Sequence, residues 1–221
     1  MFGAISNYLE PRLLDEVFNG VAFVSPATHI ALFTVMPGEA GGGTEVTGGS
    51  YARVQVNVNG GASPQWRLAA SAAPAFQVSN LNAITYPTAT ADWGEVVAWA
   101  AFDAATVGNM LWWGWLSTLE YLFTGLNAGD VFSAPAHTLL NNDRVILKAG
   151  TTALPTGVSE DTVYFVVGVS GITFQLSLTQ GGAAITLTAD GSGYVDKLSP
   201  RTVLNGDTAT FAIDALVASL S

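Results

Sequence analysis

The stretch YARVQVNV, residues 51–58, decides the fold class, because its apolar and polar side chains alternate without a break. Val54, Val56 and Val58 point to one side of an extended chain, and the polar side chains between them point to the other. Such a period of two predicts a β-strand with one buried and one solvated face. The Asn-Gly-Gly that follows, residues 59–61, is typical of a hairpin turn.

Short strand-like runs continue in both directions from this stretch, separated by Gly, Pro, Asn and Ser. In the first half they are His29–Val35, Ala75–Val78, Ile84–Tyr86, Val96–Phe102 and Met110–Leu116. In the second half they are Val131–Phe132, Arg144–Leu147, Thr162–Val167, Thr173–Leu178 and Ile185–Leu187, and residues 202–220 supply one or two final strands. Short strands at this spacing predict an all-β sandwich or barrel, and we expect an antiparallel β-sandwich.

Residues 8–19 carry the helical pattern of this otherwise strand-like sequence. Pro11 suits the first turn of a helix, and Gly20 suits its C-terminal stop. The apolar side chains fall on one helical face: Leu9, Leu13, Leu14, Val17 and Phe18. We therefore expect one N-terminal amphipathic helix that packs on a sheet edge or on a neighbouring subunit.

The composition excludes several classes of function. The chain has 221 residues, of which 49% are hydrophobic but only 11% charged, and its formal net charge is −10. A nucleic-acid-binding protein needs a basic surface to displace counterions from phosphates, and an acidic chain is also unsuited to anionic membranes. The low charged share is typical of a protein whose surface is partly covered in an assembly, although a Gly- and Ala-rich genome would give the same composition.

The sequence shows no segment for export or membrane insertion and no cysteine. Residues 1–20 include Glu10, Asp15 and Glu16 and lack a cationic start followed by an apolar run, so we expect no signal peptide. No run approaches the ~18 apolar residues of a membrane-spanning helix. The absence of cysteine removes disulfides, thiolate nucleophiles and cysteine-bound metals.

No motif for catalysis, metal binding or cofactor binding emerges from the remaining residues. His29 and His137 stand outside any metalloprotease motif, and no serine occupies a nucleophile elbow. Residues 41–44, GGGT, lack the lysine and helix of a phosphate-binding loop. The carboxylates that could form a glycosidase pair lie mostly in turns: Glu39, Glu45, Glu120, Asp130, Asp143, Glu160, Asp161 and Asp207. We expect a non-enzymatic protein with no catalytic residues, metal or cofactor.

Three tryptophans close together are the strongest candidates for a contact with another molecule. In a strand, Trp113 and Trp115 share one face and Trp112 takes the other, so both faces bear large apolar rings. One face should belong to the core. The other must be covered by the second half of the chain, by another subunit or by a sugar, and burial in the core or a subunit contact is the commoner fate of such residues.

Three segments in this order resemble a family of small virion proteins of tailed bacteriophages, described as tail-fibre or minor tail proteins. The segments are LLDEVFNG (13–20) with PATHIALFT (26–34), EAGGGTEVTGGSYAR (39–53), and ITYPTATADWGEV (84–96) with FDAAT (102–106) and GNML (108–111). The resemblance implies a structural role in the virion, after synthesis in the host cytoplasm. It also implies contacts with other virion proteins and with copies of the same chain, with a trimer favoured.

The resemblance further implies that a second domain is inserted in the first. In the family, a block like WGWLST (113–118) passes almost directly to a segment like PRTVLNGDTATF (200–211). The intervening residues resemble a small β-module of phage and bacterial surface proteins through HTLLNNDRV (137–145), DTVYFVV (161–167) and TFQLS (173–177). We expect a host β-sandwich domain, residues 1–118 with 200–221, and an inserted small β-domain, residues 119–199.

Three functions remain open at this point. The first is a structural protein of the tail fibre, the minor tail or the capsid decoration that makes subunit contacts. The second is a receptor-binding tail protein that attaches to host surface glycan or protein. The third, a glycan-cleaving tail enzyme, requires two carboxylates facing each other across a cleft.

Overall fold

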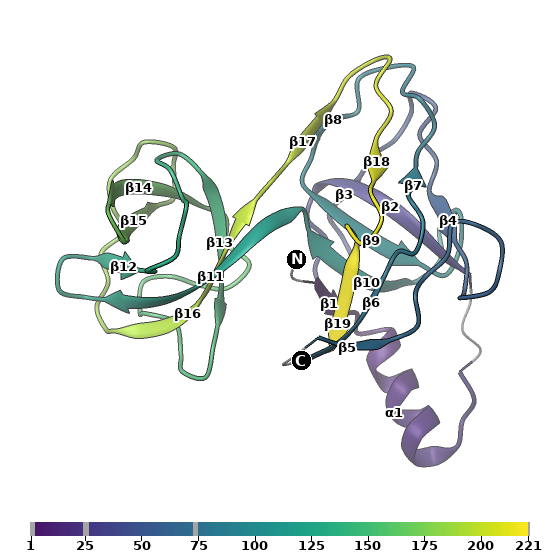
Figure 1. Ribbon diagram of the computed structural model, residues 1–221, viewed down its shortest axis with the longest axis horizontal. Coiled ribbons are helices and arrows are strands. Elements are labelled where there is room, and N and C mark those ends of the chain that lie inside the picture. Colours follow the sequence, from purple (N-terminus) through teal and green to yellow (C-terminus); the bar gives the residue numbers. More distant parts are fainter. Residues whose placement is uncertain (1–2, 24–26, 73–74, 221) are drawn as a thin grey trace. The chain divides into compact units, whose positions relative to one another are not determined.

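The structure is a computed structural model that describes residues 3–23, 27–72 and 75–220. The chain divides into two compact units, Met1–Leu116 with Pro200–Ser221 (unit 1) and Ser117–Ser199 (unit 2). Both units consist of antiparallel strands, and α1 (Leu9–Asn19) is the helix of the described residues (Figure 1). The predicted all-β class is therefore confirmed. That the two units fold independently, as a host domain and an inserted domain, stays a prediction.

One layer of unit 1 is a continuous antiparallel sheet built around β2 and β9. Its strands, in spatial order, are β1 (Gly3–Ile5), β10 (Met110–Trp115), β9 (Ala98–Phe102), β2 (Thr28–Val35) and β3 (Thr44–Glu45), and β4 (Val54–Val56) also pairs with β2. The predicted alternation around β4 holds: Val56 is fully buried in the core, whereas Arg53 extends over the other face. Val58 lies beyond the end of β4 and is exposed.

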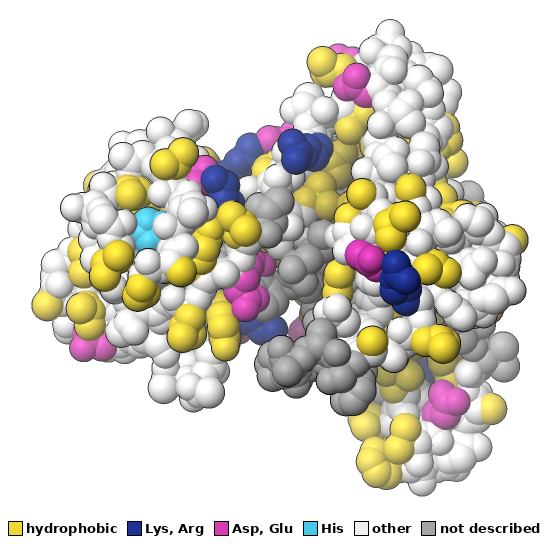
Figure 2. Space-filling view, in the orientation of Figure 1, with side chains coloured by type: hydrophobic (Ala, Val, Ile, Leu, Met, Phe, Trp, Pro, Cys, Tyr) yellow, Lys and Arg dark blue, Asp and Glu magenta, His cyan; other side chains and the backbone are white. Residues whose placement is uncertain are grey.

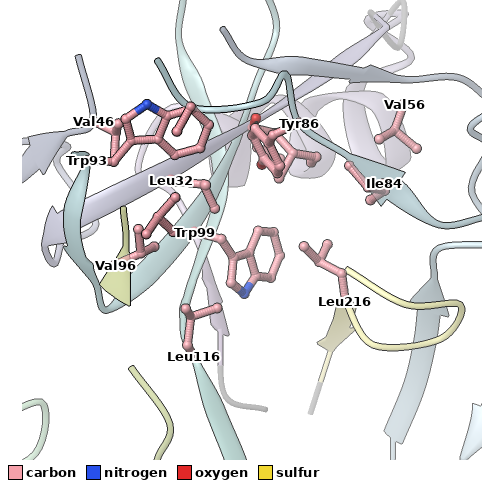
Figure 3. Close-up of a cluster of buried hydrophobic side chains, with 14 residues drawn as sticks. Leu32, Val46, Val56, Ile84, Tyr86, Trp93, Val96, Trp99, Leu116 and Leu216 are labelled. Atoms are coloured by element: carbon pink, nitrogen blue, oxygen red, sulfur yellow. The ribbon is translucent and has the colours of Figure 1, made fainter. Parts of the chain in front are cut away.

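The other layer of unit 1 is divided into three small sheets. They are β5 (Ala70–Ala72), β6 (Ala75–Ser79) and β19 (Val217–Leu220); β7 (Ile84–Thr85) with β18 (Thr210–Phe211); and β8 (Gly94–Val96) with β17 (Arg201–Val203). The main core lies between the layers, with Trp99 at its centre and Leu32, Ile84, Val96 and Leu216 around it (Figure 3). Unit 1 is thus a sandwich with one continuous and one interrupted layer.

Two expectations about unit 1 are wrong. The run Val96–Phe102 is two strands, because the N–H of Val97 donates to Phe33 and its carbonyl accepts from Leu116, so β8 and β9 join different sheets. Residues 202–220 were expected to supply one or two final strands. Instead, β17 pairs with β8, and the tail supplies three strands to three different partners.

Unit 2 is a closed barrel. Its strands, in order around the barrel, are β11 (Ser117–Leu126), β12 (Val131–Ser133), β15 (Thr173–Ser177), β14 (Tyr164–Ser170), β13 (Arg144–Ala149) and β16 (Gly191–Leu198). The rings of Phe123, Phe132 and Phe174 are buried inside, with centroids 5.2 and 5.6 Å apart. Closure leaves no unpaired sheet edge, which explains how so short a segment holds its own core.

The sequence pattern missed part of this barrel. Ile185–Leu187 is not a strand, although the N–H of Ile185 donates to the carbonyl of Leu176. Strand β16 went unpredicted because Gly191 and Gly193 interrupt its pattern, yet a side chain at Gly193 would clash with the backbone of Lys148. Ser117 and Leu198 are cross-strand partners, so the two ends of unit 2 lie side by side, as expected for an insertion.

Candidate functional site

Helix α1 is formed by local signals that the sequence contains. The carbonyl of Ser6 accepts the N–H groups of Leu9 and Glu10, at 3.0 and 3.1 Å, and so closes the first turn. At the other end Gly20 adopts a left-handed conformation, with φ of 66°, and its N–H donates to the carbonyl of Asp15. Glycine tolerates this conformation without a steric penalty, so the predicted C-terminal stop is confirmed.

The C-terminal part of the apolar face of α1 is not covered by the chain itself. No residue of the helix is buried. Leu14, Val17, Phe18 and Val21, here called the helix stripe, are 58%, 72%, 77% and 58% exposed. The spacing of three and four residues places Leu14, Val17 and Phe18 on one face of α1, and Val21 follows just after Gly20, where the helix ends. Figure 2 shows hydrophobic side chains on the surface over α1. Leu9 and Leu13, which belong to the same predicted face, are half-buried, and α1 contacts β10. A sheet edge and a neighbouring subunit therefore both remain predicted packing partners.

The charges around the helix stripe are mainly negative. Glu10, Asp15 and Glu16 oppose the single cation Arg12, so the helix carries a formal charge of −2. Arg12 is already engaged: its guanidinium lies 3.5 Å from the centre of the Tyr8 ring and donates to the Tyr8 carbonyl. Glu10 precedes Leu14 by four residues and so continues the row of the helix stripe by one turn.

A hollow opens in unit 1 where its second layer is interrupted, above core side chains that are themselves buried. Between β8–β17 and β7–β18 lies a hollow of about 340 Å³, here called the core pocket. Leu32, Tyr86, Leu116 and Phe211 line its apolar part, and Figure 3 shows Leu32, Tyr86 and Leu116 among the core side chains. Such a volume is within the range of pockets that bind drug-sized ligands.

The floor and the rim of the core pocket differ in chemistry. The Tyr86 hydroxyl donates to the carbonyl of Ile30 at 3.0 Å, and burial raises the pKa of this phenol well above its ordinary value. At the rim, the carboxylate of Asp207 accepts the N–H of Leu204. The exposed Arg201 also lines the pocket and has no ion pair or hydrogen bond within the described residues. The core pocket therefore combines an apolar floor with an available cation.

The three predicted tryptophans all belong to β10 and alternate as expected. Trp112 packs against the main core, whereas Trp113 joins a smaller cluster on the opposite face of the sheet. Trp113 and Trp115 are each only 6% exposed. The indole N–H groups of all three are buried and have no hydrogen-bond partner among the described residues. They offer little ring surface to a sugar or a subunit, and a contact role for them stays a prediction.

A polar cluster on the outer face of the sheet fixes two loops. The Arg53 guanidinium donates to both carboxylate oxygens of Glu45, at 2.8 and 2.7 Å, and to the carbonyls of Ala104 and Val107. It also lies 3.6 Å from the centre of the Phe102 ring. A hollow of about 660 Å³ adjoins this cluster, but the donors of Arg53 are directed into the protein. We interpret the cluster as structural.

Several of the carboxylates and one of the histidines considered from the sequence have structural partners. His137 accepts the N–H of Leu139 and packs edge-on against Phe174, and His29 lies within β2. The Gly-rich residues 41–44 lead into strand β3 and not into a helix. Four carboxylates each accept a backbone N–H within 2.9 Å: Asp130 from Leu187, Asp143 from Leu140, Glu160 from Ala149 and Asp207 from Leu204.

The described residues contain no group of three or more His, Asp and Glu side chains that could hold a metal ion. Within the same ranges, no helix is long and apolar enough to cross a membrane. Sequence reasoning identified α1 but could not find the core pocket, because the pocket exists only where β17 and β18 pair with strands more than one hundred residues earlier. The exposed Arg201 gave no signal in the sequence.

The comparison with protein families gives one match. The family described as "Gp80: Podophage GP4 fiber I protein gp80" matches residues 4–142, which is more than half of the chain. The match begins in β1 and extends past residue 117 into the barrel of unit 2. No curated protein matches the chain.

Proposed function

The chain belongs to the family of the podophage GP4 fiber I protein gp80 and is a structural tail fibre protein of the virion, and we propose that it binds copies of itself through the helix stripe. A tail position is favoured over capsid decoration, because the family is one of fibre proteins. Other virion proteins are further partners under this proposal, and a trimer is the favoured assembly.

The observation that carries the proposal is the exposure of the helix stripe. Four large apolar side chains in and just after α1, three of them on one helical face and all more than half exposed, are the expected features of an interaction site. Burying such a side chain fully contributes about 1.5–3 kcal/mol. An isolated helix of this length is also marginal in water, so α1 gains stability when a partner covers it.

The experiment is sedimentation of the full chain at micromolar concentration. We expect the wild type to be oligomeric and the Phe18→Asp variant to be monomeric, because a charge replaces the most exposed apolar residue of the helix stripe. Asn19→Asp adds the same charge beside it on the polar face and should leave the oligomer intact. A monomeric wild type, in solution and within the virion, contradicts the proposal.

We propose in addition that the protein is non-enzymatic. The support is that four of the carboxylates considered for catalysis accept hydrogen bonds from backbone N–H groups. We expect no release of reducing ends when purified protein is incubated with host envelope polysaccharide. Release that disappears when one carboxylate is replaced by its amide would overturn this.

A further inference from the structure

We propose that helix α1 of one copy docks into the core pocket of a second copy, with the helix stripe over the apolar floor and Glu10 paired with Arg201. This inference rests on the proposed function, in which the helix stripe is a contact between subunits. It adds the surface that receives the helix and the ion pair that orients it. The helix stripe is exposed, and the core pocket is an open hollow whose floor side chains Leu32, Tyr86 and Leu116 are at most 9% exposed.

Arg201 differs from the other Lys and Arg residues because its side chain has no partner in the described part of the chain. Arg53, Arg67 and Lys197 form ion pairs with Glu45, Asp214 and Asp143. Arg12 stacks on Tyr8, and Arg144 and Lys148 also have partners. Of the seven Lys and Arg residues, Arg201 alone has no ion pair, hydrogen bond or ring contact within the described residues. A cation beside an apolar hollow fits a partner that is apolar and acidic at once.

Helix α1 is a surface of that chemistry on the same chain. Glu10 and Glu16 have no ion pair or hydrogen bond in the described part of the chain, whereas most other carboxylates bind backbone or a cation. Glu10 lies on the side of the helix stripe, ~6 Å along the axis from Leu14. A carboxylate at Arg201 would therefore place Leu14 and Phe18 in turn over the floor of the core pocket. An ion pair between Glu10 and Arg201 would also set the direction of the helix in the pocket.

The two surfaces lie too far apart to meet within one chain. In Figure 1, α1 extends from one end of unit 1, and β8, β17 and β18 stand at the other end. The contact must then join different surfaces of two copies, which makes it head-to-tail. Such a contact closes into a ring when the rotation between copies divides a full turn, and otherwise extends into a filament. Three copies related by a third of a turn would bury three helices in three pockets.

A charge exchange tests the pairing. Arg201→Glu and Glu10→Arg should each weaken self-association of the full chain at least about tenfold, and the double variant should recover most of the loss. Glu16→Arg is the matched control. Glu16 is two residues from both Leu14 and Phe18, so it lies on the other side of the helix from these two residues. It should neither weaken association nor rescue Arg201→Glu. If Arg201→Glu has no effect while Phe18→Asp abolishes association, this inference is wrong and the proposed function stands. If neither has an effect, both fail.

Disulfide trapping gives a second test that does not depend on affinity. Because the chain has no cysteine, Glu10→Cys and Arg201→Cys can be introduced singly at the two positions that docking brings together, and equal amounts of the two proteins mixed under oxidising conditions. Docking predicts a linked dimer of one copy of each on a non-reducing gel. The mixture of Glu10→Cys with Thr106→Cys, which lies outside the core pocket, should give none. Efficient linkage of Glu10→Cys with itself alone would show that two helices pair, and would overturn the inference.

Discussion

Two ion pairs of unit 1 have similar geometry and differ in burial. Arg53 and Glu45 meet at 2.7 Å, with side chains 8% and 24% exposed, whereas Arg67 and Asp214 meet at 2.6 Å with 42% and 52% exposed. Solvent therefore screens the second pair more strongly than the first. The Arg67 hydrogen bond nevertheless lowers the pKa of Asp214, so what this pair contributes to stability is present at neutral pH and lost as the pH falls through that lowered pKa.

The Arg53→Met variant should lower the free energy of unfolding by about 3 kcal/mol, because it leaves Glu45 partly buried without its cation. It also removes the donors to the carbonyls of Ala104 and Val107, so the loop between β9 and β10 should loosen. Urea unfolding followed by tryptophan fluorescence measures the loss. Arg67→Met is the matched control and should cost far less. Equal losses for the two variants would show that burial does not decide the strength of these pairs.

At the scale of elements, α1 stands apart from the strands because its stability depends on what covers it. The strands of both units lie in sheets with buried side chains, but α1 is an 11-residue helix without a buried residue. A helix this short is marginal by itself, despite its glycine stop.

Amide hydrogen exchange should therefore depend on assembly within α1. We expect the amides of residues 13–19 to exchange rapidly in the monomeric Phe18→Asp variant and slowly in the assembled wild type. The amides of β9, at the centre of the sheet, should be protected in both. Equal protection of α1 in the two proteins would mean that assembly uses another surface.

At the scale of the whole molecule, unit 2 can be removed because its ends are neighbours. Ser117 and Leu198 are cross-strand partners, so a Gly-Ser linker of about three residues can replace residues 118–198. We expect the shortened chain to unfold cooperatively and to associate through α1. Thermal unfolding and sedimentation check this, and a chain that does not fold would contradict the two-domain organisation.

The same shortened chain tests the alternative function in host attachment. If it enters virions but the particles adsorb poorly to cells, unit 2 is the part that binds the host surface. If it folds but no longer enters virions, unit 2 contacts neighbouring virion proteins instead. Normal assembly and adsorption would assign unit 2 neither role.

The sequence by itself determined the features whose causes are local. A period of two in residues 51–58 predicted the all-β class, and Gly20 predicted the end of α1 within one residue. Several carboxylates were predicted to lie in turns, because an Asp side chain binds nearby backbone N–H groups where the chain folds back. The alternation of Trp112 with Trp113 follows equally from strand geometry.

Only the tertiary structure decided which strands pair and what remains uncovered. Strand β17 joins β8 over more than one hundred residues, and no local pattern specifies a partner at that distance. The division of the second layer, and with it the core pocket, follows from those pairings. Whether the apolar face of α1 is buried also depends on which elements lie next to it. A helical pattern predicts the apolar face but not its partner, because hydrophobic burial is non-directional.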